Sequence, residues 1–299
     1  MSIFVVKKNS ARPLAKQNFR NEKELQNFIE RNMEEFFGIR FLSSEFTISS
    51  QHGGRIDSLG LDENNSPVII EYKWGEKSNI INQGLFYLDW LVDHPGDFQL
   101  LVNKKFGKTI DVDFSSPRVL LIAQTFNKYD KYAINRMAEN IELWGYSRYE
   151  NDIFKLKLIA SSRAKQNKNS KKQLTKVNYR EYTIDKHLEN KSKKIKDLFY
   201  ALKEKIFDLE AEHTIEEVPR KIYIGYRTSQ MFMQIYVQTQ GICISFKSKK
   251  ELFNDPQKKL YNLPKGLQRR GVFSEVFLED FDELDYVVDL ISQAYLQSE

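Results

Sequence analysis

A basic stretch at residues 161–180 divides the chain, and this division limits what the remainder can fold into. Seven lysine and arginine residues and no acid lie in it: Arg163, Lys165, Lys168, Lys171, Lys172, Lys176 and Arg180. Serine, asparagine, lysine and glutamine dominate the stretch, so it has almost nothing to bury and favours an exposed connector. We therefore predict one domain at 1–160, a basic linker at 161–184 and a second domain at 185–299.

The composition outside the linker excludes several classes of protein. Without the seven charges of that stretch the net charge would change from +5 to −2, so the remainder is close to neutral. Cys243 is the lone cysteine, which excludes an internal disulfide framework and a zinc site built on several thiolates. No apolar run approaches the roughly 20 residues that span a bilayer, and we find no secretory signal. A cytoplasmic protein without a membrane partner is expected.

Helical and extended patterns alternate before the linker. Apolar residues recur at helical spacing over 22–37, 79–92 and 129–144. Segments 41–48, 55–62, 68–74, 118–124 and 153–160 have the apolar content and flanking turns of strands. This alternation predicts an α/β domain with a mixed sheet flanked by helices. After the linker, a helix at 195–209, strands at 221–226, 231–238, 241–246 and 271–278 and a helix at 281–296 predict a small α+β domain.

Three charged residues lie on or beside the most apolar of the early strands. Glu71 and Lys73 are two residues apart on strand 68–74, so they point to the same face. A hairpin at 62–67 can bring Asp57 beside them. Charges on a buried strand are costly unless they are paired or bind a metal. Two carboxylates with a neighbouring main-chain carbonyl suit Mg²⁺, and the lysine can act on a water or a phosphate, so metal-assisted phosphodiester hydrolysis is a candidate reaction.

The order of these residues resembles the PD-(D/E)XK nuclease superfamily, in its RecB-like and NucS-like branch. Asp57, Glu71 and Lys73 are similar to the D…(D/E)-x-K signature, with Ile56 where a proline usually stands. Gln83 and Tyr87 form the Q-x-x-x-Y pattern on the following helix, and Glu24 matches an acid that this branch carries on its first helix. The resemblance covers about residues 20–160. Residues 185–299 resemble a domain of unknown function labelled only as predicted transport-related.

The resemblance implies a restriction-endonuclease-like fold and a metal-dependent deoxyribonuclease, with an endonuclease favoured over an exonuclease. Asp57 and Glu71 would bind Mg²⁺ or Mn²⁺, Lys73 would assist the attacking water, and Glu24 would add a contact to the metal or the water. Gln83 and Tyr87 would position the substrate strand. By charge and position, Arg55, Lys171 and Lys172 are candidate phosphate contacts, and DNA is the expected partner.

Other interpretations of the same residues stay open at this point. Asp57, Glu71 and Lys73 could form a structural ion pair at a strand end, and the chain could be an inactive nucleic-acid-binding or complex-forming subunit that keeps the nuclease fold. A homodimer, and a partner protein bound through residues 185–299, are also open. The sequence does not distinguish DNA from RNA or a single strand from a duplex.

Overall fold

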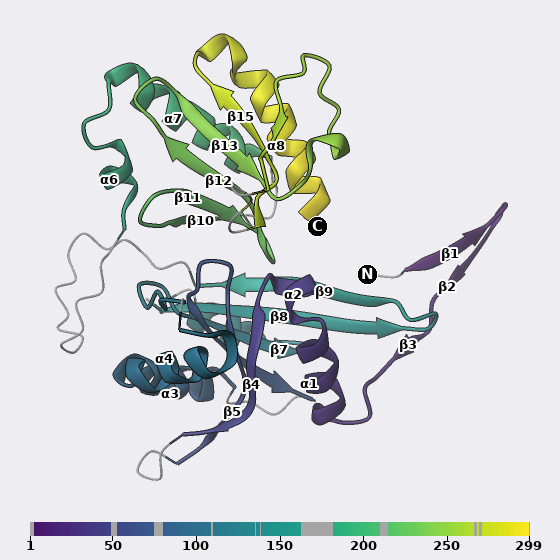
Figure 1. Ribbon diagram of the computed structural model, residues 1–299. Coiled ribbons are helices and arrows are strands. Elements are labelled where there is room, and N and C mark those ends of the chain that lie inside the picture. The colour runs from purple at the N-terminus through teal and green to yellow at the C-terminus, as the bar shows by residue number, and fades with distance from the viewer. Residues whose placement is uncertain are drawn as a thin grey trace. The chain divides into compact units, whose positions relative to one another are not determined.

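The computed structural model describes residues 3–48, 53–74, 80–108, 110–134, 136–137, 139–162, 182–209, 215–265, 268 and 271–298. The chain divides into two compact units, Met1–Asn178 and Tyr179–Glu299 (Figure 1). Residues 163–181 lie outside the described residues, and with them most of the predicted linker, including Lys171 and Lys172.

The first unit is built on a mixed sheet, as the sequence predicts, and this sheet has seven strands. The strand order is β3-β8-β7-β6-β5-β4, and β9 pairs with β8. The central strands β6, β7 and β8 are parallel to one another, and the other pairings are antiparallel. The strands are β3 (Lys16–Gln17), β4 (Arg40–Thr47), β5 (Arg55–Leu61), β6 (Pro67–Lys73), β7 (Arg118–Ala123), β8 (Asn140–Tyr149) and β9 (Phe154–Ser161).

Helices cover both faces of this sheet, and the alternation of β6 shows which residues each face receives. Val68, Ile70 and Tyr72 pack in the core that α1 (Glu22–Arg31) and α2 (Met33–Phe37) share with the sheet. Ile69 packs in the opposite core with α3 (Ile80–Asp93) and α4 (Pro95–Phe106). Successive side chains of a strand point to opposite faces, so Glu71 and Lys73 lie on the α3 side. Residues 67–72 of β6 are all buried, as expected for a central parallel strand.

Two helices expected from the sequence differ in the structure. The segment 129–144 is not one helix, because α5 (Lys128–Ile134) is followed by strand β8, whose residues Asn140–Gly145 pair with β7. The segment 22–37 is interrupted at Asn32, whose φ of −119° leaves the helical region and whose side chain donates to the carbonyl oxygen of Phe28. The first unit also contains α4 and an N-terminal hairpin of β1 (Phe4–Lys7) and β2 (Ser10–Pro13), which the sequence patterns did not reveal.

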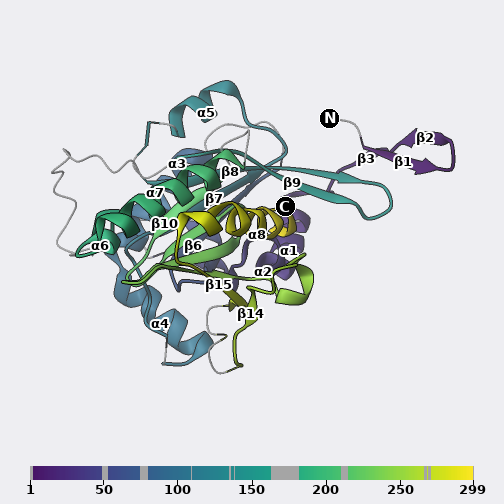
Figure 2. The same cartoon turned by 90° about the horizontal axis from the view of Figure 1, so that it is seen from above.

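The second unit is an α+β fold, again as predicted. Its sheet is antiparallel, with the order β10-β11-β12-β13-β15-β14. Helices α7 and α8 share one core with the sheet (Figure 2). Its strands are β10 (Glu216–Pro219), β11 (Ile224–Arg227), β12 (Met231–Val237), β13 (Ile242–Phe246), β14 (Tyr261–Asn262) and β15 (Ser274–Leu278). Its helices are α6 (Ile184–Leu188), α7 (Lys193–Asp208), α8 (Leu284–Ser298) and the short 3₁₀ turns η1 (Lys250–Leu252) and η3 (Phe281–Glu283).

Among the described residues, no helix has the length and apolar content needed to cross a membrane.

Candidate active site

Asp57 and Glu71 meet where strands β5 and β6 separate. The backbone ladder between the two strands ends at the pair Ser58–Ile70. One residue further on, the backbone N–H of Asp57 donates to Oε1 of Glu71 over 3.0 Å. The backbone N–H of Tyr72 donates in turn to Oδ2 of Asp57 over 3.1 Å. Each carboxylate therefore accepts an amide of the other strand, and the sheet itself holds the two side chains together.

Burial dominates the electrostatics of this pair. Glu71 is 2% exposed, and burial together with the charge of Asp57 raises the pKa of its carboxyl group to about 9. Burial also raises the pKa of Asp57, and Glu22 and Glu45 add to that effect. Desolvation and like charge both disfavour the ionised forms, so without a cation the pair retains a proton at neutral pH.

Lys73, on the same strand as Glu71, provides a positive charge that acts on both carboxyl groups. Its charge lowers the pKa of both carboxyl groups, but by less than burial raises them. Among the described residues, no ion pair within 4.0 Å joins Lys73 to either carboxylate. Lys73 as a residue is half-buried at the end of β6, two positions after Glu71.

Helix α3 brings Tyr87 against the same strand end. Its hydroxyl accepts the backbone N–H of Arg55 over 3.3 Å. Burial raises the pKa of Tyr87, and Glu71 and Asp57 contribute, which places the phenol within the field of the pair. Gly54 lies here at a φ of +138°, and a Cβ on it would come within 3.1 Å of the Tyr87 ring. Gln83 lies one turn earlier on the same helix face, half-buried, and no described hydrogen bond joins it to the carboxylates.

Arg55 lies at the start of β5 beside the pair. Its Nε forms an ion pair with Oε2 of Glu45 at 2.5 Å, and Glu45 also accepts from Lys23 at 2.8 Å. The Arg55 side chain is 62% exposed, so it remains accessible to a ligand although Glu45 holds it.

The first helix presents Glu22, rather than Glu24, to this region. Oε2 of Glu22 accepts the backbone N–H of Trp74, directly after Lys73, over 3.0 Å. Glu24 instead accepts the backbone N–H of Arg20 over 2.6 Å and lies 3.7 Å from Arg148. Two residues along a helix correspond to about 200° of rotation, so the two acids lie on opposite sides of α1.

The sequence pattern singled out Glu24 and not Glu22, because the contact that turns this side of α1 toward the site is made by Gln26 and is visible only in the structure. Residues four apart lie on the same side of a helix. The buried Gln26 donates from Nε2 to the main-chain carbonyl oxygen of Asp57 over 2.7 Å. The side of α1 that carries Glu22 therefore meets the strand that carries Asp57.

A buried polar network supports the pair from the α1 side of the sheet. Nε2 of Gln26 also lies 3.0 Å from Oε1 of Glu30, and Ser58 Oγ donates to the same oxygen over 2.6 Å. The hydroxyl groups of Ser58 and Tyr72 are 3.1 Å apart. These contacts connect α1, β5 and β6 next to Asp57 and Glu71, which limits the movement of both strands.

The donor set fits a hard divalent cation that keeps part of its water shell. Asp57 and Glu71 offer carboxylate oxygens only, which Mg²⁺ and Mn²⁺ accept, and Mg²⁺ is commonly held by one or two carboxylates together with water and phosphate. Within the described ranges no group of three or more His, Cys, Asp or Glu residues is arranged to hold a metal. A cation at this position would favour the ionised forms that burial disfavours.

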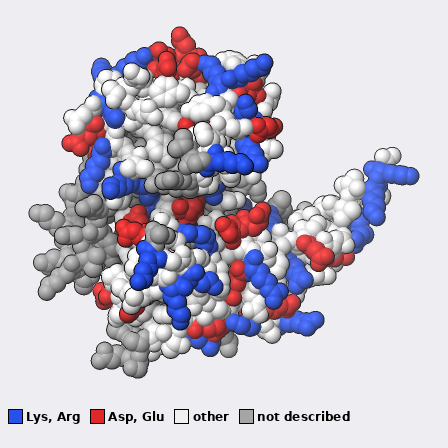
Figure 3. Space-filling model, viewed as in Figure 1, with Lys and Arg blue, Asp and Glu red and all other residues white. Residues whose placement is uncertain are grey.

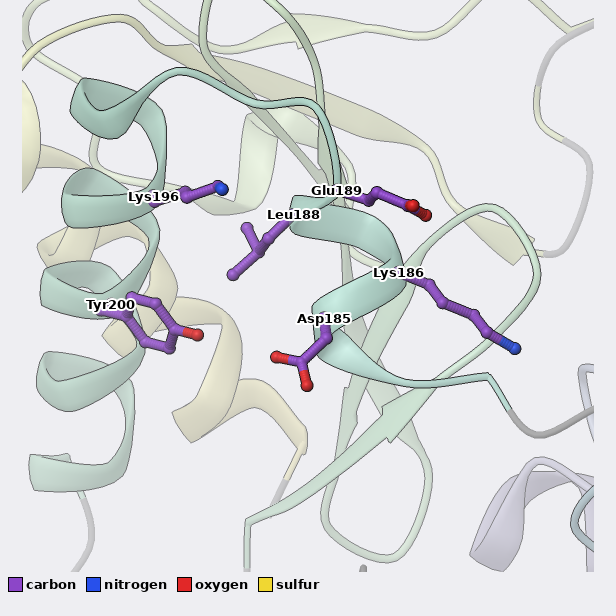
Figure 4. A pocket seen from close by; sticks show the side chains of 6 residues that line it. All are labelled: Asp185, Lys186, Leu188, Glu189, Lys196 and Tyr200. Carbon is purple, nitrogen blue, oxygen red and sulfur yellow. The ribbon is translucent and has the colours of Figure 1, made fainter. Parts of the chain in front are cut away.

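A concave surface lies in the second unit, between α6 and α7. It has a volume of about 530 Å³ and is lined by Asp185, Lys186, Leu188, Glu189, Lys196 and Tyr200 (Figure 4). Its charged side chains are of both signs and mostly exposed. Side chains of both charges therefore do not indicate one class of ligand for this surface, in contrast to the buried carboxylate pair of the first unit.

Comparison with known proteins gives a family but no described activity. No protein-family model matches the chain. The structure of the EndoMS–dsDNA2 complex is similar over 43% of this chain and 47% of that one, at 16% identity and a TM-score of 0.25. An uncharacterized protein of Haemophilus influenzae is 31% identical over 308 residues, covering 98% of this chain and 99% of that protein. The chain therefore belongs to the same family as this Haemophilus influenzae protein.

Proposed function

We propose that the chain is a metal-dependent nuclease that hydrolyses phosphodiester bonds in DNA. The observation that carries this proposal is the buried pair of Asp57 and Glu71, each held by the backbone of the other's strand, with Lys73 beside it. A structural salt bridge would pair the lysine with a carboxylate, whereas here the two acids face each other. Such a pair is unfavourable by itself and becomes favourable with a divalent cation.

Asp57 and Glu71 would hold Mg²⁺ or Mn²⁺. The cation would supply a Lewis acid for the phosphate and lower the pKa of a water. Lys73 would orient that water or stabilise negative charge on the phosphate, since its ammonium group is not used in a salt bridge with the pair. Tyr87 and Gln83 would position the substrate strand from the α3 side. Arg55 would contact a phosphate, and this contact would replace its ion pair with Glu45.

Incubation with defined substrates tests this proposal. The protein would be incubated with linear, circular, single-stranded and branched DNA and with RNA of matched sequence. Each substrate would be tested with Mg²⁺, with Mn²⁺ and with chelator. We expect cleavage of DNA with either metal and none with chelator, and cleavage of the circular form would identify an endonuclease. Lys73→Ala should lose most of the activity. Full metal-dependent cleavage by a folded Lys73→Ala protein would reject the assigned site.

The two acids of α1 offer a matched comparison within the same helix. Glu22→Gln should lower the cleavage rate by about 10–100-fold, the usual effect of removing a group just outside the ligands, because Glu22 holds the backbone after Lys73 and adds negative charge near Asp57. Glu24→Gln should change the rate by no more than about threefold, because its carboxylate accepts the backbone N–H of Arg20 and pairs with the side chain of Arg148. Initial rates at saturating Mg²⁺ measure both variants. The opposite ranking would restore Glu24 to the role that the sequence predicts.

A further inference from the structure

A hairpin at the N-terminus projects from the first unit. Strands β1 and β2 pair with each other in the register Phe4–Pro13 to Lys7–Ser10 and with no other described strand. In both ribbon views the hairpin extends beyond β3 and the turn between β8 and β9 (Figures 1 and 2). We call residues 4–13 the N-terminal arm. An isolated two-stranded hairpin is at best marginally stable in water, so the arm is suited to contact something else.

The arm and the segment that follows it carry only positive charge. From residue 3 to residue 21 there is no acid, and the charged residues are Lys7, Lys8, Arg12, Lys16 and Arg20. All five are exposed. Lys and Arg side chains mark the outer end of the projection in the space-filling view (Figure 3). The cations are therefore presented to solvent on an element with little core of its own.

The pairing register sorts the arm into two faces. Phe4, Val6, Ala11 and Pro13 share one face, on which Phe4 is 53% and Val6 is 68% exposed. Val5, Lys7, Ser10 and Arg12 share the other. Arg12 forms an ion pair with Glu150 at 2.5 Å, which anchors the base of the arm near the end of β8. No ion pair to a described acid holds Lys7, and Lys8 lies in the turn at a φ of 51°.

The chain leads directly from the arm to the candidate active site. Lys16 pairs with Tyr149 and Gln17 with Arg148, so β3 joins the basic segment to the sheet. Helix α1 begins at Glu22, whose carboxylate accepts the amide of Trp74 next to Lys73. The cationic segment is thus fixed at one end to the edge of the site.

We infer that the N-terminal arm binds the phosphate backbone of the nucleic acid on which the site acts. This inference rests on the proposed function and adds a contact outside the catalytic residues. A two-stranded ribbon fits the major groove of a duplex, and lysines that contact phosphates release counterions. Pairing of two arms about a twofold axis would instead bring like charges together, so a second copy of the chain is the less favourable occupant.

Charge reversal at the tip of the arm tests this inference. Lys7→Glu/Lys8→Glu changes two exposed side chains, and Lys104→Glu/Lys108→Glu makes the same change at exposed positions near the end of α4. That end lies beside Arg40, which pairs with Leu61 at the opposite end of β5 from Asp57. Binding of a short fluorescein-labelled DNA duplex in chelator would be measured by anisotropy across a potassium chloride titration. The arm variant should bind at least about 10-fold more weakly, with a salt dependence of log affinity reduced by about two units.

The outcomes separate this inference from the proposed function. Equal affinities of the arm variant, the α4 variant and the wild type would overturn the arm as a phosphate contact, even if all three cut DNA with Mg²⁺. If the protein cuts no nucleic acid but its binding still depends on the arm, the arm remains a phosphate contact and the proposed nuclease activity is rejected. Light scattering would be run on the same samples. A change of oligomeric state in the arm variant with unchanged affinity would assign the arm to a second copy of the chain and overturn the inference.

Discussion

Asp57→Asn should abolish metal-dependent cleavage, with a rate at least about 10³-fold below that of the wild type. The substitution removes one of two carboxylate ligands, and the stabilisation that a metal gives to the transition state is several kcal/mol. A loss of about 4 kcal/mol corresponds to about 10³-fold in rate. The fold should survive, because an asparagine Oδ1 can still accept the amide of Tyr72 that Asp57 accepts now.

Single-turnover cleavage of the best substrate at saturating Mg²⁺ measures this effect, with circular dichroism to show that the variant is folded. Asp97→Asn provides the control, since it makes the same chemical change at an exposed position in the first turn of α4. We expect the control to keep the wild-type rate. A folded Asp57→Asn protein that cuts within tenfold of the wild type would exclude Asp57 as a metal ligand.

The stability of the metal-free protein should fall as the pH rises, and Glu71 should account for the fall. The pKa of its carboxyl group is raised from the ordinary value of 4.5 to about 9 in the folded chain. A raised pKa gives a contribution that is complete below pH 4.5 and is lost as the pH rises toward 9. Between these values the free energy of unfolding should decrease by up to about 1.4 kcal/mol per pH unit, because unfolding then releases a proton.

Urea unfolding in chelator at several pH values measures this slope. Glu71→Gln should flatten it and should raise the stability at pH 8, because the neutral amide does not have to take up a proton when the chain folds. Glu35→Gln on α2 is the matched control at an exposed position and should leave the slope unchanged. Addition of Mg²⁺ should stabilise the wild type at pH 8 and have little effect on Glu71→Gln. If Glu71→Gln leaves the pH dependence of the free energy of unfolding unchanged, the pKa of Glu71 is not raised as described.

The central strands were predictable because strands that are buried on both faces appear in the sequence as nearly continuous apolar runs. The predicted strand 118–124 contains the continuous apolar run 119–123, and the structure has β7 there at Arg118–Ala123. Strand β6 is bounded by the predicted turn at 62–67. The mixed sheet with helices on both faces and the C-terminal α+β unit are confirmed in the same way, from runs and periodicities that a single segment displays.

Segment 129–144 was predicted wrongly because the decisive interaction is not local. Ile141 and Trp144 occur at spacings that a helix also accepts, together with apolar residues near position 134. In the structure Ile141 pairs with Val119 and Trp144 with Ile122, so the parallel partner β7 decides the outcome. A contact between positions more than 20 residues apart overrides local preference here.

The proximity of Asp57 to Glu71 followed from strand alternation and one short turn, and the structure brings the two together. The position of Glu22 depends on how α1 is rotated against the sheet, and the core contacts of Leu25 and Ile29 set this rotation. The sequence does not contain that rotation, so Glu24 fits the pattern of an acid on the first helix equally well. The catalytic role of these residues, the metal and the substrate remain predictions. Lys171 and Lys172 fall outside the described residues.

The exchange of backbone amides between Asp57 and Glu71 makes the registry of two strands a condition of the proposed chemistry. A slip of β5 by one residue would turn Asp57 away from Glu71 and bring a neighbouring side chain to that face. Insertions or deletions in the turn at 62–67 that shift this registry would therefore silence the site without removing any of its residues. Turn length should accordingly be held constant among members of the family that keep both carboxylates, even where the turn's own residues vary.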